Sequence, residues 1–158
     1  VSIPGIAGLH AAQKWFAELG KSQSTDFPNT HYDACRVALE HIHAIEIEIT
    51  RQLIDAFDAI PGVILYGPRG DQPRISTFSI NIGDLPAEQV GSMLDADHGI
   101  CVRSGLHCAP TVHQDQDTLK RNGTVRFAPG FFTDEEDIAQ AIDGVRSIAE
   151  YPMSRTAT

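Results

Sequence analysis

GICVRSGLHCAP at Gly99–Pro110 and GTVRFAPGFF at Gly123–Phe132 are the two stretches that decide how this chain folds. Each contains a short run typical of a β-strand, Ile100–Arg103 in the first stretch and Thr124–Ala128 in the second. The loop between the two runs carries a cysteine, Cys108. We therefore predict two strands that bracket a loop thiol.

The two predicted strands each carry one arginine, Arg103 and Arg126, and His107 directly precedes Cys108. Positive charge close to a thiol favours the thiolate, so Cys108 is a candidate nucleophile. The guanidinium group is permanently charged and suits bidentate binding of a carboxylate. The residues predict a loop thiol that faces a small molecule with a carboxylate.

Simpler explanations remain open for these residues. The spacing alone does not separate a reactive Cys108 from an incidental loop cysteine. Val125 and Phe127 should face the other side of the strand from Arg126, so this guanidinium either reaches a ligand or forms a surface ion pair. The same alternatives apply to Arg103.

The remaining cysteines and nearby histidines suggest no second site. We predict that Cys101, in an apolar strand, and Cys35, on a long helix, are buried small hydrophobic residues. A zinc site is the rival hypothesis, but its spacing is irregular and no C-x-x-C motif occurs, so we predict no metal site. Its ligands would come from His98, Cys101, His107, Cys108 and His113.

Apolar periodicity and capping residues predict the other elements. A helix is expected from Ser2 to a stop at Gly20, then a loop at Lys21–Thr30. A second helix of about 30 residues follows from His31 to Ile60. The further expectations are strands at Val63–Tyr66 and Ser76–Ile82, a helix capped by Asp84 and ended by Gly99, and a last helix with a capping box of Thr133 and Glu136. This order predicts an α+β fold with helices packed on one face of a small sheet.

Length and composition limit the class of protein. A chain of 158 residues with 42% hydrophobic content predicts one domain with its own core. The net charge of −9 argues against nucleic acid or an anionic membrane as the main partner. No apolar run reaches the roughly 18 residues of a transmembrane helix. Three cysteines without a dense pattern fit a reducing compartment, so we predict a cytoplasmic protein.

Several motifs in one order resemble a known family. VRSGLHCAP and GTVRFAPGFFTDEEDI are similar to the C-terminal part of the cysteine desulfurase group of class V aminotransferases, which also includes selenocysteine lyases. IPGIAGLHAA, IPGVILYGP, STFSINI and DHGICVRSG fall in the order of that family, so the resemblance covers Ile3 to Ile148. It implies the small C-terminal domain of a fold-type I transferase dependent on pyridoxal phosphate, with a mainly antiparallel sheet.

The resemblance implies roles for the residues already identified. Cys108 matches the catalytic cysteine that attacks the substrate sulfur and becomes a persulfide. Arg126 matches the arginine that binds the substrate carboxylate, and Arg103 matches the arginine that shapes that site. His107 lies beside the nucleophile and is expected to contribute to the substrate site.

The resemblance also implies that this chain is a fragment. The family holds pyridoxal phosphate on a lysine of its large domain, and Lys14, Lys21 and Lys120 have no matching context. We expect residues 1–20 to be a connecting helix from the large domain, residues 21–150 the small domain and residues 151–158 a tail. The fragment alone is expected to be inactive. The intact enzyme is expected to be a homodimer that acts on cysteine or selenocysteine and can pass sulfur to an acceptor protein.

Three hypotheses for function follow. The first is a desulfurase-like enzyme, and it is favoured because only it uses Cys108, Arg103 and Arg126 together. The second is another class V aminotransferase or lyase, in which Cys108 would be dispensable. The third is a non-enzymatic metal-binding module, which predicts bound zinc and no need for the cofactor.

Overall fold

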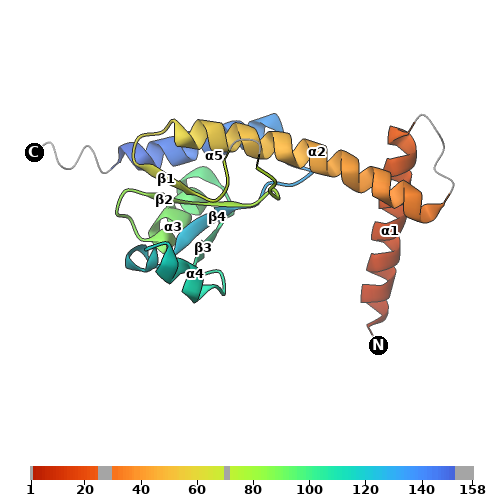
Figure 1. Ribbon diagram of the computed structural model, residues 1–158, viewed down its shortest axis with the longest axis horizontal. Coiled ribbons are helices and arrows are strands. Elements are labelled where there is room, and N and C mark those ends of the chain that lie inside the picture. The colour runs from red at the N-terminus through yellow and green to blue at the C-terminus, as the bar shows by residue number, and fades with distance from the viewer. Residues whose placement is uncertain (1, 25–29, 70–71, 152–158) are drawn as a thin grey trace, which may run out of the picture. The chain divides into compact units, whose positions relative to one another are not determined.

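The computed structural model describes residues 2–24, 30–69 and 72–151 (Figure 1). Residues 25–29 of the predicted loop and 152–158 of the predicted tail lie outside this description. The chain divides into two compact units, residues 1–46 and 47–158. The elements are α1 (Ile3–Gln23), α2 (His31–Asp58), β1 (Val63–Tyr66), β2 (Phe78–Ile82), α3 (Ala87–His98), β3 (Arg103–Gly105), α4 (Pro110–Asp115), the 3-10 helix η1 (Leu119–Arg121), β4 (Thr124–Phe127) and α5 (Glu135–Glu150). The predicted α+β class is confirmed. No helix within the described ranges is long and apolar enough to cross a membrane.

Helix α1 begins as predicted and ends later than predicted. The Ser2 hydroxyl accepts a hydrogen bond from the Gly5 amide at 3.3 Å, which satisfies a free N–H of the first turn. The predicted stop at Gly20 is wrong, because the helix continues to Gln23. Gly20 is buried, and a Cβ there would overlap the backbone carbonyl of Ala34 on α2. The glycine therefore lets two helices approach closely instead of ending one of them.

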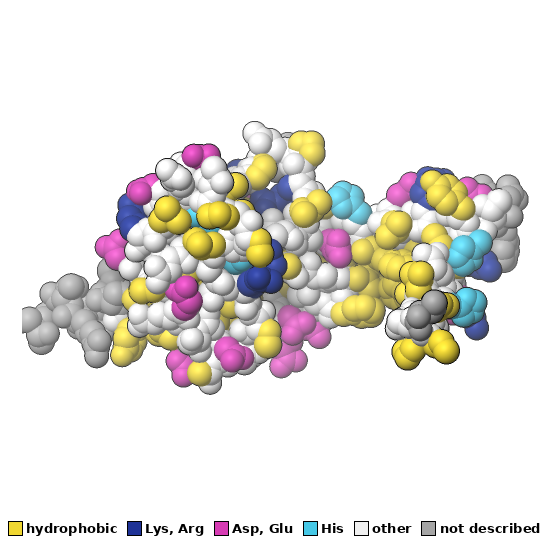
Figure 2. Space-filling model, turned by 90° about the horizontal axis from the view of Figure 1, so that it is seen from below, with side chains coloured by type: hydrophobic (Ala, Val, Ile, Leu, Met, Phe, Trp, Pro, Cys, Tyr) yellow, Lys and Arg dark blue, Asp and Glu magenta, His cyan; other side chains and the backbone are white. Residues whose placement is uncertain are grey.

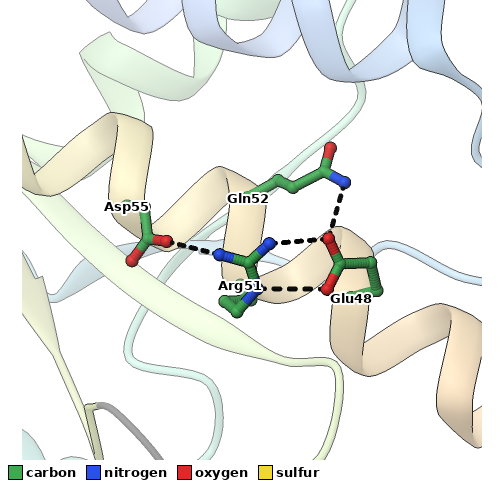
Figure 3. Close-up of polar contacts among 4 residues, drawn as sticks. All are labelled: Glu48, Arg51, Gln52 and Asp55. Atoms are coloured by element: carbon green, nitrogen blue, oxygen red, sulfur yellow. Dashed lines mark hydrogen bonds and ion pairs between the residues drawn. The ribbon is translucent and has the colours of Figure 1, made fainter.

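Helix α2 is 28 residues long, as the periodicity predicted, and it carries a polar network on its exposed side (Figure 3). Arg51 donates to both carboxylate oxygens of Glu48, at 3.0 and 2.7 Å, and to Asp55 at 3.1 Å. Gln52 donates to Glu48 at 2.9 Å. The hydrogen bond from Arg51, followed by that from Gln52, lowers the pKa of Glu48 to about 2. Glu48 therefore stays charged well into the acid range.

The four strands form one antiparallel sheet in the order β1-β2-β4-β3. The predicted strand Val63–Tyr66 is confirmed, and the predicted strand Ser76–Ile82 is observed as Phe78–Ile82. Alternation along the strands gives the sheet one buried apolar face. Its side chains include Leu65, Phe78, Ile80, Val125 and Phe127. The core of the second unit lies on this face.

Helices cover the apolar face of the sheet. Phe57 of α2 contacts Phe78 and Phe127 edge-on, with ring centroids 5.7 and 5.2 Å apart. Leu94 of α3 and Val145 of α5 are fully buried and complete the core. Figure 1 shows α5 and the C-terminal part of α2 along one side of the sheet and α4 on the other. The loop that carries Cys108 therefore lies at the opposite face of the sheet, next to α4.

Two helix starts differ from the prediction. Asp84 does not cap α3: Pro86 occupies the N-cap position without a side-chain hydrogen bond, while Asp84 pairs with Arg121 at 2.9 Å. The capping box of α5 is formed by Asp134 and Asp137, one residue later than the predicted Thr133 and Glu136. Asp134 supplies a charged cap, which suits a helix N-terminus. The predicted stop at Gly99 is confirmed by its left-handed conformation (φ 64°).

The predicted strand Ile100–Arg103 is wrong in its bounds. The observed strand β3 starts at Arg103 and ends at Gly105, so only Arg103 belongs to both. Cys101 precedes the strand and is exposed, which contradicts its predicted burial. Cys35 is half-buried instead of buried. Residues 100–102 are largely apolar but lie before the paired segment, so apolar character alone does not define a strand.

Candidate functional site

Cys108 lies on a tight turn with an unusual backbone. The Ala109 amide donates to the Leu106 carbonyl at 2.8 Å and closes the turn. Its two central residues, His107 and Cys108, have φ of 51° and 60°. Residues other than glycine rarely adopt this left-handed region. Each such residue lowers the stability of the fold by about 1 kcal/mol or more. The turn presents Cys108 as an exposed thiol directly before α4.

His107 ties this turn to strand β4. Its Nε2 lies 3.0 Å from the Thr124 carbonyl oxygen and 3.2 Å from Thr124 Oγ1. A carbonyl only accepts, so Nε2 carries the hydrogen and donates. In the neutral ring Nδ1 is then a lone-pair acceptor, and it is buried without a hydrogen-bond partner among the described residues. The His107 side chain therefore holds the turn of Cys108 against the sheet.

Charge and burial keep His107 neutral. Burial lowers its pKa most, and the hydrogen bond with Thr124 opposes that shift. The positive charges of Arg126 and Arg103, and His113, lower the pKa further. At pH 7 the imidazole is therefore uncharged, and the two arginines supply the positive charge of the site.

Buried polar side chains form hydrogen bonds close to this turn. Thr118 Oγ1 donates to the His113 carbonyl at 3.2 Å, so His113 Nδ1 donates to Thr118 Oγ1 at 2.7 Å. Asn81 Nδ2 donates to the Gly123 carbonyl at 3.0 Å. A Cβ on Gly123 would overlap the Gly105 carbonyl, so only glycine fits this close approach. Asn81, His113 and Thr118 lay outside the predicted site, since nothing in their local pattern marks them as its support.

Arg103 and Arg126 are direct neighbours across β3 and β4, and Ser79 of β2 is the next residue in the same row. Val125 and Phe127 are buried on the opposite face, as predicted, so the row lies on the face away from the core. Neither arginine side chain forms an ion pair or a hydrogen bond with any residue that the structure describes. The ion-pair alternative therefore has no support within these ranges.

Other arginines of the second unit do have partners. Arg121 donates to the Gly83 carbonyl at 2.7 Å and pairs with Asp84, and Arg74 donates to the Thr77 carbonyl at 3.0 Å. Figure 2 shows Lys or Arg side chains gathered near the middle of its face of this unit, with His side chains close by. Two adjacent uncompensated guanidinium groups repel each other, and a bound carboxylate would relieve that repulsion.

The rival zinc site is not assembled. Within residues 2–24, 30–69 and 72–151, no three or more His, Cys, Asp or Glu side chains come close enough to hold a metal ion. Cys101 instead lines a cavity of about 220 Å³ together with Thr133 and Gln140 of the α5 region. Cys108 is not part of that cavity. Of the predicted residues, Cys108 and His107 share one turn, and His107 lies close enough to Arg126 and Arg103 for their charges to lower its pKa.

Family and sequence comparisons both match this chain to class V aminotransferases and cysteine desulfurases. A match to the Aminotransferase class-V family covers residues 1–141. A probable cysteine desulfurase of Synechocystis is 35% identical over 105 residues, which make up 65% of this chain and 24% of that protein. A cysteine desulfurase of Klebsiella pneumoniae is 35% identical over 105 residues, or 66% of this chain and 20% of that protein. The chain thus spans about a quarter or less of the length of these relatives.

Solved structures show the same fold. The apo cysteine desulfurase of Thermococcus onnurineus matches with a TM-score of 0.64 at 26% identity, covering 81% of this chain and 33% of that one. A cysteine desulfurase of Escherichia coli matches with a TM-score of 0.59 over 80% of this chain and 32% of its own. At 18% identity the second likeness shows the fold alone. The predicted fold, that of the C-terminal part of such enzymes, is confirmed.

Proposed function

Because this chain belongs to the class V aminotransferase family, we propose that it is the C-terminal part of a cysteine desulfurase-like enzyme in which Cys108 accepts sulfur. The observation that carries the proposal is the turn of His107 and Cys108, strained and exposed beside two unpaired arginines. Strain of this kind persists only where surrounding contacts hold it, and it is common at active sites.

Each of the four residues receives a role under this proposal. Arg126, half-buried and flanked by Ser79 and Arg103, binds the carboxylate of the substrate. Arg103 adds a second positive charge and orients that carboxylate. His107 holds the turn through Thr124. Because its own ring is neutral, the positive charge of the site comes from Arg103 and Arg126.

Cys108 performs a two-electron sulfur transfer. Its thiolate forms a bond to the substrate sulfur while the bond between that sulfur and the substrate carbon breaks. The electron pair stays with the carbon, which is then protonated, so cysteine yields alanine and Cys108 becomes a persulfide. Selenocysteine would react in the same way and leave selenium on Cys108.

The family depends on pyridoxal phosphate, and the lysines described here do not suit its Schiff base. Lys14 pairs with Glu18 at 3.8 Å on exposed helix surface, Lys120 pairs with Asp117, and Lys21 lies exposed in the last turn of α1. A Schiff-base lysine needs a neutral amine in an enclosed site. We place the cofactor, which supplies the electron sink for such chemistry, in another part of a longer protein.

We propose further that the intact enzyme is a homodimer in the cytoplasm and passes the Cys108 sulfur to an acceptor protein. The exposed position of Cys108 supports such a transfer, because a persulfide there is open to attack by a second thiol.

The test is persulfide formation on the intact protein, loaded with pyridoxal phosphate and given cysteine. The peptide containing Cys108 should gain the mass of one sulfur atom, and alanine production should be lost in Cys108→Ala. Cys101→Ala is the matched control and should keep both signals, because Cys101 lies in a separate cavity. Normal turnover by Cys108→Ala would overturn the proposal and indicate another class V activity.

A further inference from the structure

One face of the sheet carries a row of polar side chains, one from each strand. Strand register places Tyr66 of β1 opposite Ser79 of β2. Ser79 is in turn opposite Arg126 of β4, which is opposite Arg103 of β3. Because Leu65, next to Tyr66 in β1, is buried in the core, the row lies on the face away from the core. Ser79 is therefore the neighbour of Arg126 on the side opposite to Arg103.

The hydroxyl of Ser79 has no partner within the described part of the chain. Ser79 is half-buried, and its Oγ forms no hydrogen bond with any residue in the ranges 2–24, 30–69 and 72–151. By contrast, Ser76 in the same segment donates to the Pro129 carbonyl at 2.6 Å. A hydroxyl that is partly removed from water needs a hydrogen-bond partner, and a ligand bound beside Arg126 would supply one.

The row has the donors that a carboxylate needs. A carboxylate has two oxygens with about four lone-pair positions, and one bidentate guanidinium occupies two of them. Arg126 has Arg103 on one side and Ser79 on the other, with the Cβ atoms of opposed residues roughly 5 Å apart. A hydroxyl adds a donor without adding a third positive charge beside the two arginines. The row thus offers donors from both sides of Arg126.

The row also lies close to the turn of Cys108. Thr124 lies two residues before Arg126 in β4, so both side chains are on the same face, roughly 7 Å apart along the strand. His107 contacts Thr124 and directly precedes Cys108. A ligand whose carboxylate lies on the row can therefore extend along β4 toward this turn.

We propose that Ser79 is a substrate-binding residue, whose hydroxyl donates a hydrogen bond to the carboxylate that Arg126 holds. This inference rests on the proposed function, and it adds a neutral third group to the carboxylate site. Arg126 and Arg103 supply the charge, while Ser79 fixes the orientation of the carboxylate from the other side. No atom of Ser79 takes part in the sulfur transfer. Ser79 therefore contributes to the binding of cysteine and not to the chemistry of Cys108.

The test is steady-state kinetics of the intact protein, loaded with pyridoxal phosphate. Cysteine is the substrate, and alanine, which carries the same carboxylate, is the competitive inhibitor. Ser79→Ala should raise both the KM for cysteine and the inhibition constant of alanine about tenfold, because one hydrogen bond to a charged group is lost. It should leave kcat within about twofold, because that bond is made equally in the ground state and in the transition state. Ser79→Thr keeps the hydroxyl on a residue suited to a strand, so it should keep both constants within about threefold of wild type.

Tyr66→Phe is the matched control, because it removes the other hydroxyl of the row. Strand β2 separates Tyr66 from Arg126. Burial raises the pKa of Tyr66 against the positive charges of Arg121 and Lys120, so its hydroxyl lies toward η1. Tyr66→Phe should change neither the KM for cysteine nor the inhibition constant of alanine.

A double variant tests whether Ser79 and Arg126 hold the same carboxylate. When Arg126→Gln is already present, adding Ser79→Ala should raise the KM by less than about threefold, because the carboxylate is no longer held in place. A full tenfold effect in that background would overturn the proposal.

Other results would also overturn it. These are a KM in Ser79→Ala within about twofold of wild type, or equal effects of Ser79→Ala and Tyr66→Phe. The mass of the Cys108 peptide separates this failure from failure of the proposed function. Wild type and Ser79→Ala should both form the persulfide at saturating cysteine, and its absence from the wild type would remove the proposed function itself.

Discussion

Arg103 and Arg126 lie directly opposite each other on β3 and β4, and neither has an acidic partner within the part of the chain that the structure describes. Like charges in directly opposed cross-strand positions destabilise a sheet. A protein keeps such a pair where an anionic ligand uses it. The pair therefore links the stability of the sheet to the proposed binding of a carboxylate.

Neutralising one arginine should stabilise the chain and weaken the enzyme. We expect Arg103→Gln to raise the free energy of unfolding by about 0.5 kcal/mol, because cross-strand repulsion is removed. In the intact enzyme Arg126→Gln should raise KM for cysteine more than Arg103→Gln does, because Arg126 is the less exposed of the two. Chemical denaturation and steady-state kinetics measure these effects. A loss of stability in Arg103→Gln would show that the arginine has a stabilising partner.

Cys108→Gly should increase stability and abolish function. Glycine adopts a φ of 60° without strain, so we expect the free energy of unfolding to rise by about 0.5 kcal/mol after the entropy cost of glycine. Persulfide formation should be abolished. Cys101→Gly is the control: no positive φ occurs there, so this change should only destabilise. Equal stability changes in the two variants, measured by denaturation, would show that the turn stores no strain.

The contribution of His107 to stability should decline in acid. Its pKa in the folded protein is lowered, chiefly by burial, from an unfolded value of about 6.5. The unfolded state therefore binds the proton more readily. The contribution is fully present above pH 6.5 and falls as the pH drops toward the folded pKa.

The difference in unfolding free energy between wild type and His107→Gln should accordingly shrink between pH 7.5 and pH 5. Thr124→Val is a useful companion, because it removes the hydroxyl contact of His107 and keeps the carbonyl contact. It should show a smaller loss at pH 7.5 than His107→Gln. A difference that stays constant over this range would contradict a neutral, half-buried imidazole.

Gly20→Ala should weaken the first unit. Its Cβ would overlap the Ala34 carbonyl, so we expect a loss of stability despite the roughly 1 kcal/mol by which alanine normally favours a helix. Gly8→Ala meets nothing within 4 Å and should stabilise α1. Thermal unfolding followed by circular dichroism compares the two. If both substitutions stabilise, α1 does not pack on α2 as described.

Local patterns predicted much of this protein correctly. The long helix from His31, the strand Val63–Tyr66 and the stop at Gly99 all follow from apolar spacing and from the conformational freedom of glycine. The motif around Cys108 indicated a candidate nucleophile flanked by two arginines. These features depend on residues close together in the chain, where periodicity and turn chemistry act directly.

The sequence by itself therefore determined the α+β class, the family and the candidate thiol with its arginines. The tertiary structure alone decided which groups meet: Arg103 opposite Arg126, His107 Nε2 on the Thr124 carbonyl, and Ser79 beside Arg126. Strand register and helix packing set these pairings through contacts between distant segments, and side-chain burial is a property of those contacts. For the same reason, only the structure revealed that Cys101 is exposed and that Gly20 serves packing.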